Sequence, residues 1–199
     1  NMAYNSTSWT TDANTKAGST GTNTVGGVTL YKQFNLYDLS VAQNTHYPML
    51  LGFQYSSSSI TGDNAFGTGT DPATSLDISA KGANWKQFIM CYWYLTDNIY
   101  IDEVSILSGC DGAHNLDYHL YSYTFDNNTN IGDLSSGALL AHCSSVIQSG
   151  GTSAPTIKQS NMVIDSSSVD SGKVILAFVE NTEGTSDITA QMTVKYHLI

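Results

Sequence analysis

Arginine does not occur in this sequence, and charged residues of every kind make up only 12% of it. Seven lysines are set against 17 acidic residues, which gives a formal net charge of −10 at pH 7. A surface of this sign repels phosphate backbones, and the residue that most often contacts phosphate and guanine through two hydrogen bonds is missing. The composition therefore argues against nucleic acid as a partner.

Long apolar runs and a cysteine framework are also lacking. No stretch of 18 apolar residues occurs, so no membrane helix is predicted and no membrane partner is expected. The three cysteines, Cys91, Cys110 and Cys143, are odd in number and widely spaced, without a CxxC pair. We expect them to be buried as small apolar side chains rather than to form a disulfide framework.

Catalytic and metal-binding motifs are missing as well. The five histidines form no HxH or HExxH pair, and no GxSxG, P-loop or GxGxxG occurs. His114 and His119 are five residues apart, which gives little support for a shared metal. Residues 126–137 begin like a calcium-binding loop but lack the glycine and the glutamate that the motif requires. We expect no enzyme activity, catalytic residue, metal or cofactor, although an oxygen-rich cation site in loop 63–71 or 126–137 stays an alternative.

The sequence is instead rich in Ser, Thr, Asn and Gly, and its apolar content of 41% is sufficient for a core. The longest apolar segment covers residues 88–95, and its aromatic content favours a central strand with both faces covered. A polar turn at 96–98 is expected to fold a second strand, 99–107, back beside the first as a hairpin.

Further strands are expected along the whole chain, because no segment shows a sustained helical period. Residues 138–147 fit a helix or a strand by pattern alone, and their neighbours favour a strand. Residues 188–198 alternate without a break, so one face should pack and the polar face should meet solvent or a partner. The other expected strands are 28–37, 47–55, 76–80, 116–125, 156–165 and 173–179. These patterns predict an all-β fold, an antiparallel β-sandwich of jelly-roll or Greek-key type, formed by residues 28–199 as one domain.

Residues 1–27 have a different composition, almost wholly Ser, Thr, Asn, Gly and Ala, with Tyr4 and Trp9 as the large side chains. Such a segment cannot bury enough apolar surface to fold alone. It is predicted to be an irregular N-terminal arm or linker. It is either a free terminus or a tether that orders on a neighbouring subunit, with Tyr4 and Trp9 as the assembly anchors.

Five segments of the chain carry a likeness to a known group of proteins. They are residues 82–89 (GANWKQFI), 99–107, 116–125, 169–175 (VDSGKVI) and 188–198. In strand order and turn placement they resemble the jelly-roll domains of structural proteins from tailed bacteriophages, especially marine ones, of the capsid decoration and knob or fibre types. The resemblance covers a little over half of the chain and includes no diagnostic motif.

This resemblance implies a virion structural protein, a capsid (head) decoration or knob protein that acts without catalysis. It implies a homo-oligomer, with a trimer favoured, that binds the major capsid protein or another virion protein. The expected location is the capsid surface, outside the cell, with the N-terminal arm used for anchoring.

Two other functions are kept as alternatives. The first is a glycan-binding jelly-roll module of a phage tail fibre or a secreted adhesin, which would bind a host-surface glycan by aromatic stacking. The aromatic residues available for it are Tyr92, Trp93, Tyr94, Tyr118, Tyr121 and Tyr123, although packing in a core is the commoner use of such side chains. The second is a hydrolase on the same fold, for which no pair of carboxylates can be nominated.

Overall fold

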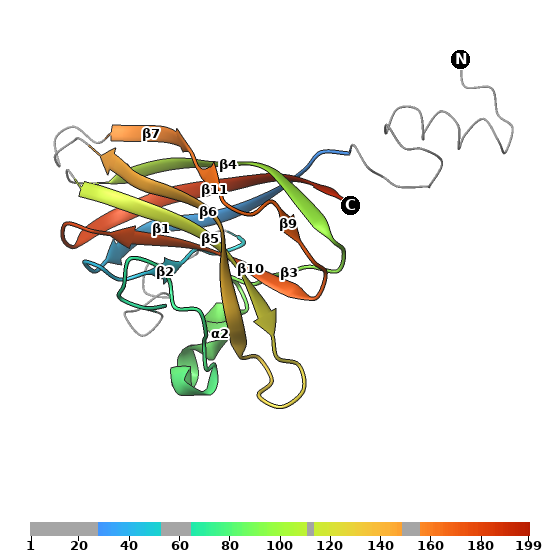
Figure 1. Cartoon of the computed structure of the whole chain (residues 1–199). Helices are drawn as coiled ribbons and strands as arrows, with labels where there is room; N and C mark the ends of the chain where they lie inside the picture. Colours follow the sequence, from blue (N-terminus) through green and yellow to red (C-terminus); the bar gives the residue numbers. More distant parts are fainter. Residues whose placement is uncertain (1–27, 53–64, 111–113, 149–155) are drawn as a thin grey trace, which may run out of the picture.

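The computed structural model describes residues 28–52, 65–110, 114–148 and 156–199, which form two antiparallel sheets packed face to face (Figure 1). The predicted all-β sandwich is confirmed.

Sheet A has the strand order β1, β11, β4, β7, and the short β9 pairs with one end of β4. Its strands are β1 (Leu30–Val41), β4 (Ile99–Cys110), β7 (Thr156–Asn161), β9 (Ser168–Val169) and β11 (Ser186–Leu198). In β11, Ile188, Met192 and Val194 are fully buried, while Thr189 and Gln191 on the other face are accessible. The alternation predicted for this strand is confirmed over its first half, and it leaves the other face of sheet A uncovered by any described segment.

Sheet B has the order β2, β10, β5, β6, β8, with β3 paired to one end of β10. Its strands are β2 (Tyr47–Pro48), β3 (Trp93–Tyr94), β5 (His114–Phe125), β6 (Leu134–Gln148), β8 (Val163–Ile164) and β10 (Lys173–Asn181). Every residue of β10 from Val174 to Asn181 is buried. A strand without an exposed side chain requires a cover on both faces of its sheet.

The pairing of the eight main strands is nested. The first, β1, pairs with the last, β11; β2 pairs with β10; β4 pairs with β7; and β5 pairs with β6. Four of these strands belong to each sheet. This is the arrangement of a jelly roll, in which two antiparallel sheets enclose one core.

An outer layer, formed by residues 42–46 and 65–92, covers the second face of sheet B. Phe66 of this layer packs on Phe178 of β10 and Tyr123 of β5, with ring centroids 4.8 and 5.5 Å apart. The layer also contains the short helices η3 (Ser79–Asn84) and α2 (Trp85–Phe88), and Figure 1 shows α2 on the far side of sheet B from sheet A. The layer explains why β10 is buried on both faces from Val174 to Asn181.

The predicted central strand at 88–95 is wrong. Helix α2 ends at Phe88, a turn follows, and only Trp93 and Tyr94 form a strand. β3 joins sheet B whereas β4 joins sheet A, so the predicted hairpin between them does not exist. The apolar run serves different layers, because Phe88 packs in the outer layer while Trp93 contacts Phe34 and Tyr196 of sheet A.

Two shorter strand predictions also fail. In 76–80, Leu76 makes an isolated bridge to Leu134, and η3 begins at Ser79 because the Asp77 carboxylate accepts hydrogen bonds from the backbone N–H groups of Ser79 and Ala80. Such a carboxylate satisfies the free N–H groups of a helical turn. In 47–55 the described residues form a strand only at β2, and residues 53–55 lie outside the described part of the chain. The strand predicted at 138–147 is confirmed as part of β6.

Candidate interaction surfaces

The uncovered face of sheet A carries rows of uncharged side chains that lie opposite one another across four strands. The rows across β1, β11, β4 and β7 are Gln33, Thr193, Ser105 and Asn161, followed by Asn35, Gln191, Leu107 and Gln159. Amides within this face bind each other, since Gln191 Nε2 donates to Asn35 Oδ1 at 3.1 Å. The two rows contain no charged residue, in contrast to the net charge of the chain.

A shallow groove of about 320 Å³ lies on this face, where β1, β11, β4 and β7 meet. The exposed apolar side chains of its lining are Tyr37, Leu107 and Ile157, of which Tyr37 and Ile157 are 60% and 74% exposed. The cores of protein interfaces are depleted in charge and enriched in tyrosine. The groove shares both features, while the polar side chains around it are those of an ordinary solvated sheet face.

A buried cluster of histidines and carboxylates lies between the outer layer and sheet B. His46 is fully buried, and its Nε2 atom lies 3.3 Å from Oε2 of Glu180 on β10. Burial, and secondarily His119, lowers the pKa of His46 to about 4. Burial, followed by repulsion from Asp117 and Asp71, raises the pKa of Glu180 to about 7. The pair therefore holds one proton across a wide range of pH.

His119 extends this cluster toward loop 63–71. Its ring lies 5.1 Å from the ring of His46, and its Nε2 atom lies 3.8 Å from Oδ1 of Asp71. The same Asp71 oxygen accepts a hydrogen bond of 3.1 Å from the Tyr121 hydroxyl. Burial lowers the pKa of His119, so the neutral imidazole is favoured. The cluster joins the outer layer to β5 and β10 by polar contacts.

The cluster does not have the geometry of a metal centre. Within the described ranges, no three His, Cys, Asp or Glu side chains are placed to hold one metal ion. His114 and His119, the histidine pair closest in sequence, are five residues apart on β5 and so lie on opposite faces. No disulfide joins the three cysteines; Cys91 and Cys110 are buried as predicted, whereas Cys143 is only partly buried.

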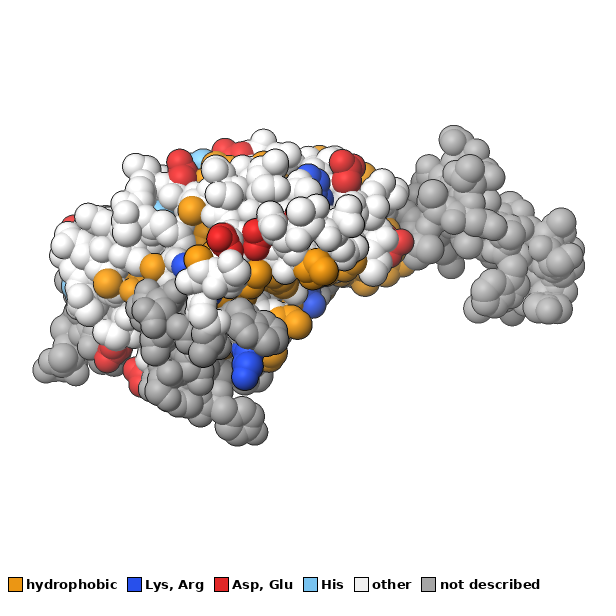
Figure 2. Space-filling view, turned by 90° about the horizontal axis from the view of Figure 1, so that it is seen from below, with side chains coloured by type: hydrophobic (Ala, Val, Ile, Leu, Met, Phe, Trp, Pro, Cys, Tyr) orange, Lys and Arg blue, Asp and Glu red, His pale blue; other side chains and the backbone are white. Residues whose placement is uncertain are grey.

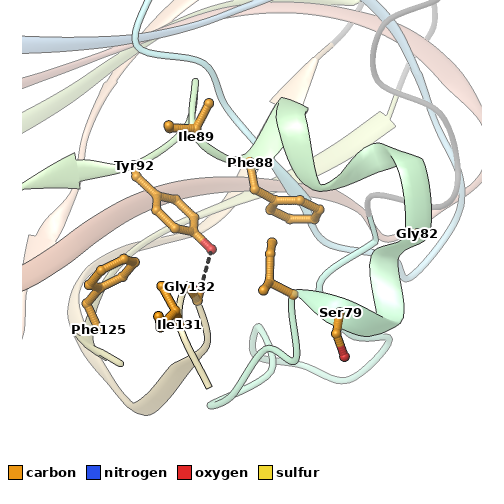
Figure 3. A pocket seen from close by; sticks show the side chains of 9 residues that line it. Ser79, Gly82, Phe88, Ile89, Tyr92, Phe125, Ile131 and Gly132 are labelled. Atoms are coloured by element: carbon orange, nitrogen blue, oxygen red, sulfur yellow. Dashed lines mark hydrogen bonds between the residues drawn. The ribbon is translucent and has the colours of Figure 1, made fainter. Parts of the chain in front are cut away.

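An apolar cavity of about 460 Å³ opens in the outer layer, between α2 and the loop that joins β5 to β6 (Figure 3). Its lining comes from three segments, 78–82, 88–92 and 125–132. The Tyr92 ring points into it, and the Tyr92 hydroxyl donates a long hydrogen bond of 3.5 Å to the Gly132 carbonyl (Figure 3). Ile89 and Ile131 line the cavity and are largely exposed, and other hydrophobic side chains reach the surface on this side of the molecule (Figure 2).

The aromatic residues that the sequence offered for glycan stacking are used mainly in the core. Trp93, Tyr118, Tyr121 and Tyr123 are buried, whereas Tyr94 is exposed. The sequence pattern did not lead us to Tyr37, which is exposed in the groove. Its position follows from the alternation of β1, because Phe34 and Leu36 face the core and their odd-numbered neighbours face outward. No local sequence pattern of this kind predicts the cluster of His46, His119, Asp71 and Glu180.

The remaining sequence candidates lie in loops or outside the described residues. Tyr4 and Trp9, the proposed anchors, are outside them. In loop 126–137 the Asp126 carboxylate accepts hydrogen bonds from three backbone N–H groups, which lower its pKa. This carboxylate stabilises the turn of its own loop.

Comparisons with known proteins do not assign this chain to a family. No family model and no curated protein matches the chain. A chain in the structure of infectious bursal disease virus, Gx strain, is similar with a TM-score of 0.27 and 8% identity, over 83% of this chain and 32% of that one. The present chain thus spans about a third of that chain, and a TM-score this low does not establish a common fold.

No helix among the described residues has both the length and the apolar character that crossing a membrane requires.

Proposed function

We propose that this chain is a structural protein of a virion that binds neighbouring subunits through the uncovered face of sheet A. The observation that carries the proposal is the groove with Tyr37, Leu107 and Ile157, which lies among uncharged amides and hydroxyls. A face of this kind is stabilised when a second protein removes it from water.

The nested strand pairing adds a second line of support. Jelly rolls form many viral coat proteins, and they also form lectin domains, so the fold narrows the function without deciding it. The phage-protein resemblance favours the viral use. We further propose the specific role of a capsid decoration or knob protein at the particle surface, bound to the major capsid protein and arranged as a trimer.

The oligomeric state of the full chain tests the role of the face. The Tyr37→Asp substitution places a charge in the centre of the groove, and a buried unpaired charge strongly disfavours association. We expect the variant to weaken self-association or shell binding at least 10-fold by light scattering and sedimentation. Tyr94→Asp, at a tyrosine that is 52% exposed on β3, is the matched control and should leave association unchanged.

Two results would contradict the proposal. One is a wild-type chain that stays monomeric at all concentrations and binds no viral shell. The other is an equal effect of both substitutions, which would show that the sheet A face is not the contact. Mass spectrometry of purified particles tests the virion assignment separately, because a structural protein co-purifies with them in fixed proportion.

Glycan binding is the second candidate, and the same groove favours it. Tyr37 presents an exposed ring beside the amides of Asn35 and Gln191 and the hydroxyl of Thr189, which together offer stacking and hydrogen bonds to a neutral sugar. A glycan array with the wild-type chain and the Tyr37→Asp variant tests it. A blank array rejects this candidate, and a signal that the variant loses without a change in oligomeric mass supports it.

A further inference from the structure

The apolar cavity of the outer layer has a lining that defines the chemistry of its occupant. The lining contains no charged residue, and its large side chains are Phe88, Tyr92, Phe125 and isoleucines. The Gly132 carbonyl accepts only a long hydrogen bond from Tyr92, 3.5 Å, so a better placed N–H donor would bind it more strongly. The occupant that fits is a flat apolar ring with one N–H group.

The rim of the cavity indicates an occupant larger than a small molecule. Ile131 is 70% exposed, and Ile89 on the opposite side is 65% exposed. Met90 beside them is also exposed. Exposed apolar side chains that surround an apolar cavity are typical of a site where another protein segment lies across the surface.

The chain itself contains a segment with this chemistry. Residues 1–27 carry only Asp12 and Lys16 as charged residues and include one tryptophan, Trp9. The indole ring is flat, apolar and has a single N–H donor. Eighteen residues separate Trp9 from Val28, and such a length reaches up to about 60 Å when extended.

The position of the first described residues favours insertion into another copy. The chain enters β1 at a point remote from α2, and the backbone there leads away from the outer layer (Figure 1). We propose that Trp9 of one copy occupies the apolar cavity of a second copy, with its indole N–H donating to the Gly132 carbonyl. This head-to-tail contact rests on the proposed self-association, and repeated around an axis it closes a ring such as a trimer.

A complementation experiment with the full chain tests the exchange. Trp9→Ala removes the ring but keeps the cavity, whereas Ile131→Lys places a charge at the rim but keeps the arm. Each variant alone should associate about 10- to 100-fold more weakly than wild type, the range for loss of a central tryptophan. An equimolar mixture should form heterodimers, because the arm of the Ile131→Lys copy can enter the cavity of the Trp9→Ala copy. Sedimentation with one variant carrying a fluorescent label measures this.

The controls keep the result interpretable. Val163→Lys makes the same change at a position that is 59% exposed on β8, far from the cavity lining, and should associate as wild type. N-acetyltryptophanamide, titrated into the Trp9→Ala variant, should shift the methyl NMR signals of Ile78 in the cavity lining, and this shift should be lost in the variant that carries both Trp9→Ala and Ile131→Lys.

Three outcomes would overturn the proposal. Trp9→Ala could associate as wild type, the mixture could show no recovery, or the amide could leave the cavity signals unchanged. Failure of the proposed function looks different, since then Tyr37→Asp has no effect on association or particle binding. Loss in Tyr37→Asp with none in Trp9→Ala would retain the sheet A interface and reject the exchange of the arm.

Discussion

At the scale of single residues, the most unusual feature is the buried pair of His46 and Glu180. The pKa of Glu180 is about 7, above its ordinary 4.5, and the pKa of His46 is about 4, below its ordinary 6.5. Between pH 4.5 and 7 the folded protein holds a proton on Glu180 that the unfolded chain has released, so Glu180 makes stability fall as pH rises. Between pH 4 and 6.5 the unfolded chain holds a proton that His46 lacks, so His46 makes stability rise with pH. Between pH 4.5 and 6.5, Glu180 and His46 therefore change the unfolding free energy in opposite directions.

The Glu180→Gln substitution should remove the pH dependence of the unfolding free energy that comes from Glu180. The amide stays uncharged at every pH, so the slope from His46 is no longer compensated. We expect the unfolding free energy of the variant, relative to wild type, to rise by up to about 3 kcal/mol between pH 4.5 and 7.5. Urea unfolding at a series of pH values measures the difference. Glu183→Gln, at an exposed carboxylate of the following turn, is the control and should give a flat difference; a flat difference for Glu180→Gln as well would contradict the assigned pair.

The sequence could not reveal this pair, because no local pattern links a histidine before β2 to a glutamate near the end of β10. Their contact depends on the outer layer folding over sheet B. Tyr37 is the opposite case. Its exposure follows from the alternation of β1, and a stricter use of that alternation would have identified the groove.

At the scale of secondary structure elements, segment 88–95 shows where sequence patterns fail. Its apolar residues lie in three different environments: in the outer layer, at the surface, and between the two sheets. A continuous apolar run in the sequence does not show which residue lies in which environment. The prediction for β11 was right because strict alternation of apolar and polar residues specifies a strand with one covered face. Local signals therefore predicted the strands of sheet A better than the irregular outer layer.

The outer layer packs closely against sheet B at Gly137 of β6, and this contact gives a prediction for the element. The Gly137 N–H donates to the Thr74 carbonyl at 2.8 Å, and a Cβ atom at position 137 would lie 2.6 Å from the Tyr123 ring and 2.8 Å from Thr74 Cα. The Thr74 backbone cannot move away from Gly137 without breaking the hydrogen bond between these two residues. We expect Gly137→Ala to lower the unfolding free energy by about 1–3 kcal/mol, the range for overpacking.

Urea unfolding monitored by circular dichroism measures this effect, and hydrogen exchange locates it. Protection should fall first in residues 73–78 and in the facing part of β6. Gly52→Ala is the matched control, because a Cβ atom there meets no heavy atom within 4 Å. If Gly137→Ala were as stable as wild type, the close packing of the outer layer on β6 would be wrong.

At the scale of the whole molecule, the nested pairing of β1 with β11 and β2 with β10 joins the two ends of the described chain. Strand existence was predictable, but the partner of each strand was not, because pairing between distant segments leaves no periodic trace. The strand pattern predicted a jelly roll or a Greek key, and the phage-protein resemblance favoured the jelly roll. The net charge of −10 is likewise a property of the whole chain, and it contrasts with the neutral rows of sheet A.

This contrast determines how association should respond to salt. Copies with a charge of −10 repel each other, while the linings of the proposed contacts, the groove on sheet A and the apolar cavity, contain no charged residue. Raising NaCl from about 0.1 M to about 1 M shortens the range of charge interactions from roughly 10 Å to roughly 3 Å. Self-association measured by sedimentation should therefore tighten with salt, by about 3- to 10-fold, because repulsion is screened and apolar contacts are kept. The gain should shrink near pH 5, where carboxylates begin to protonate, whereas association that weakens with salt would show that ion pairs, not these uncharged surfaces, hold the copies together.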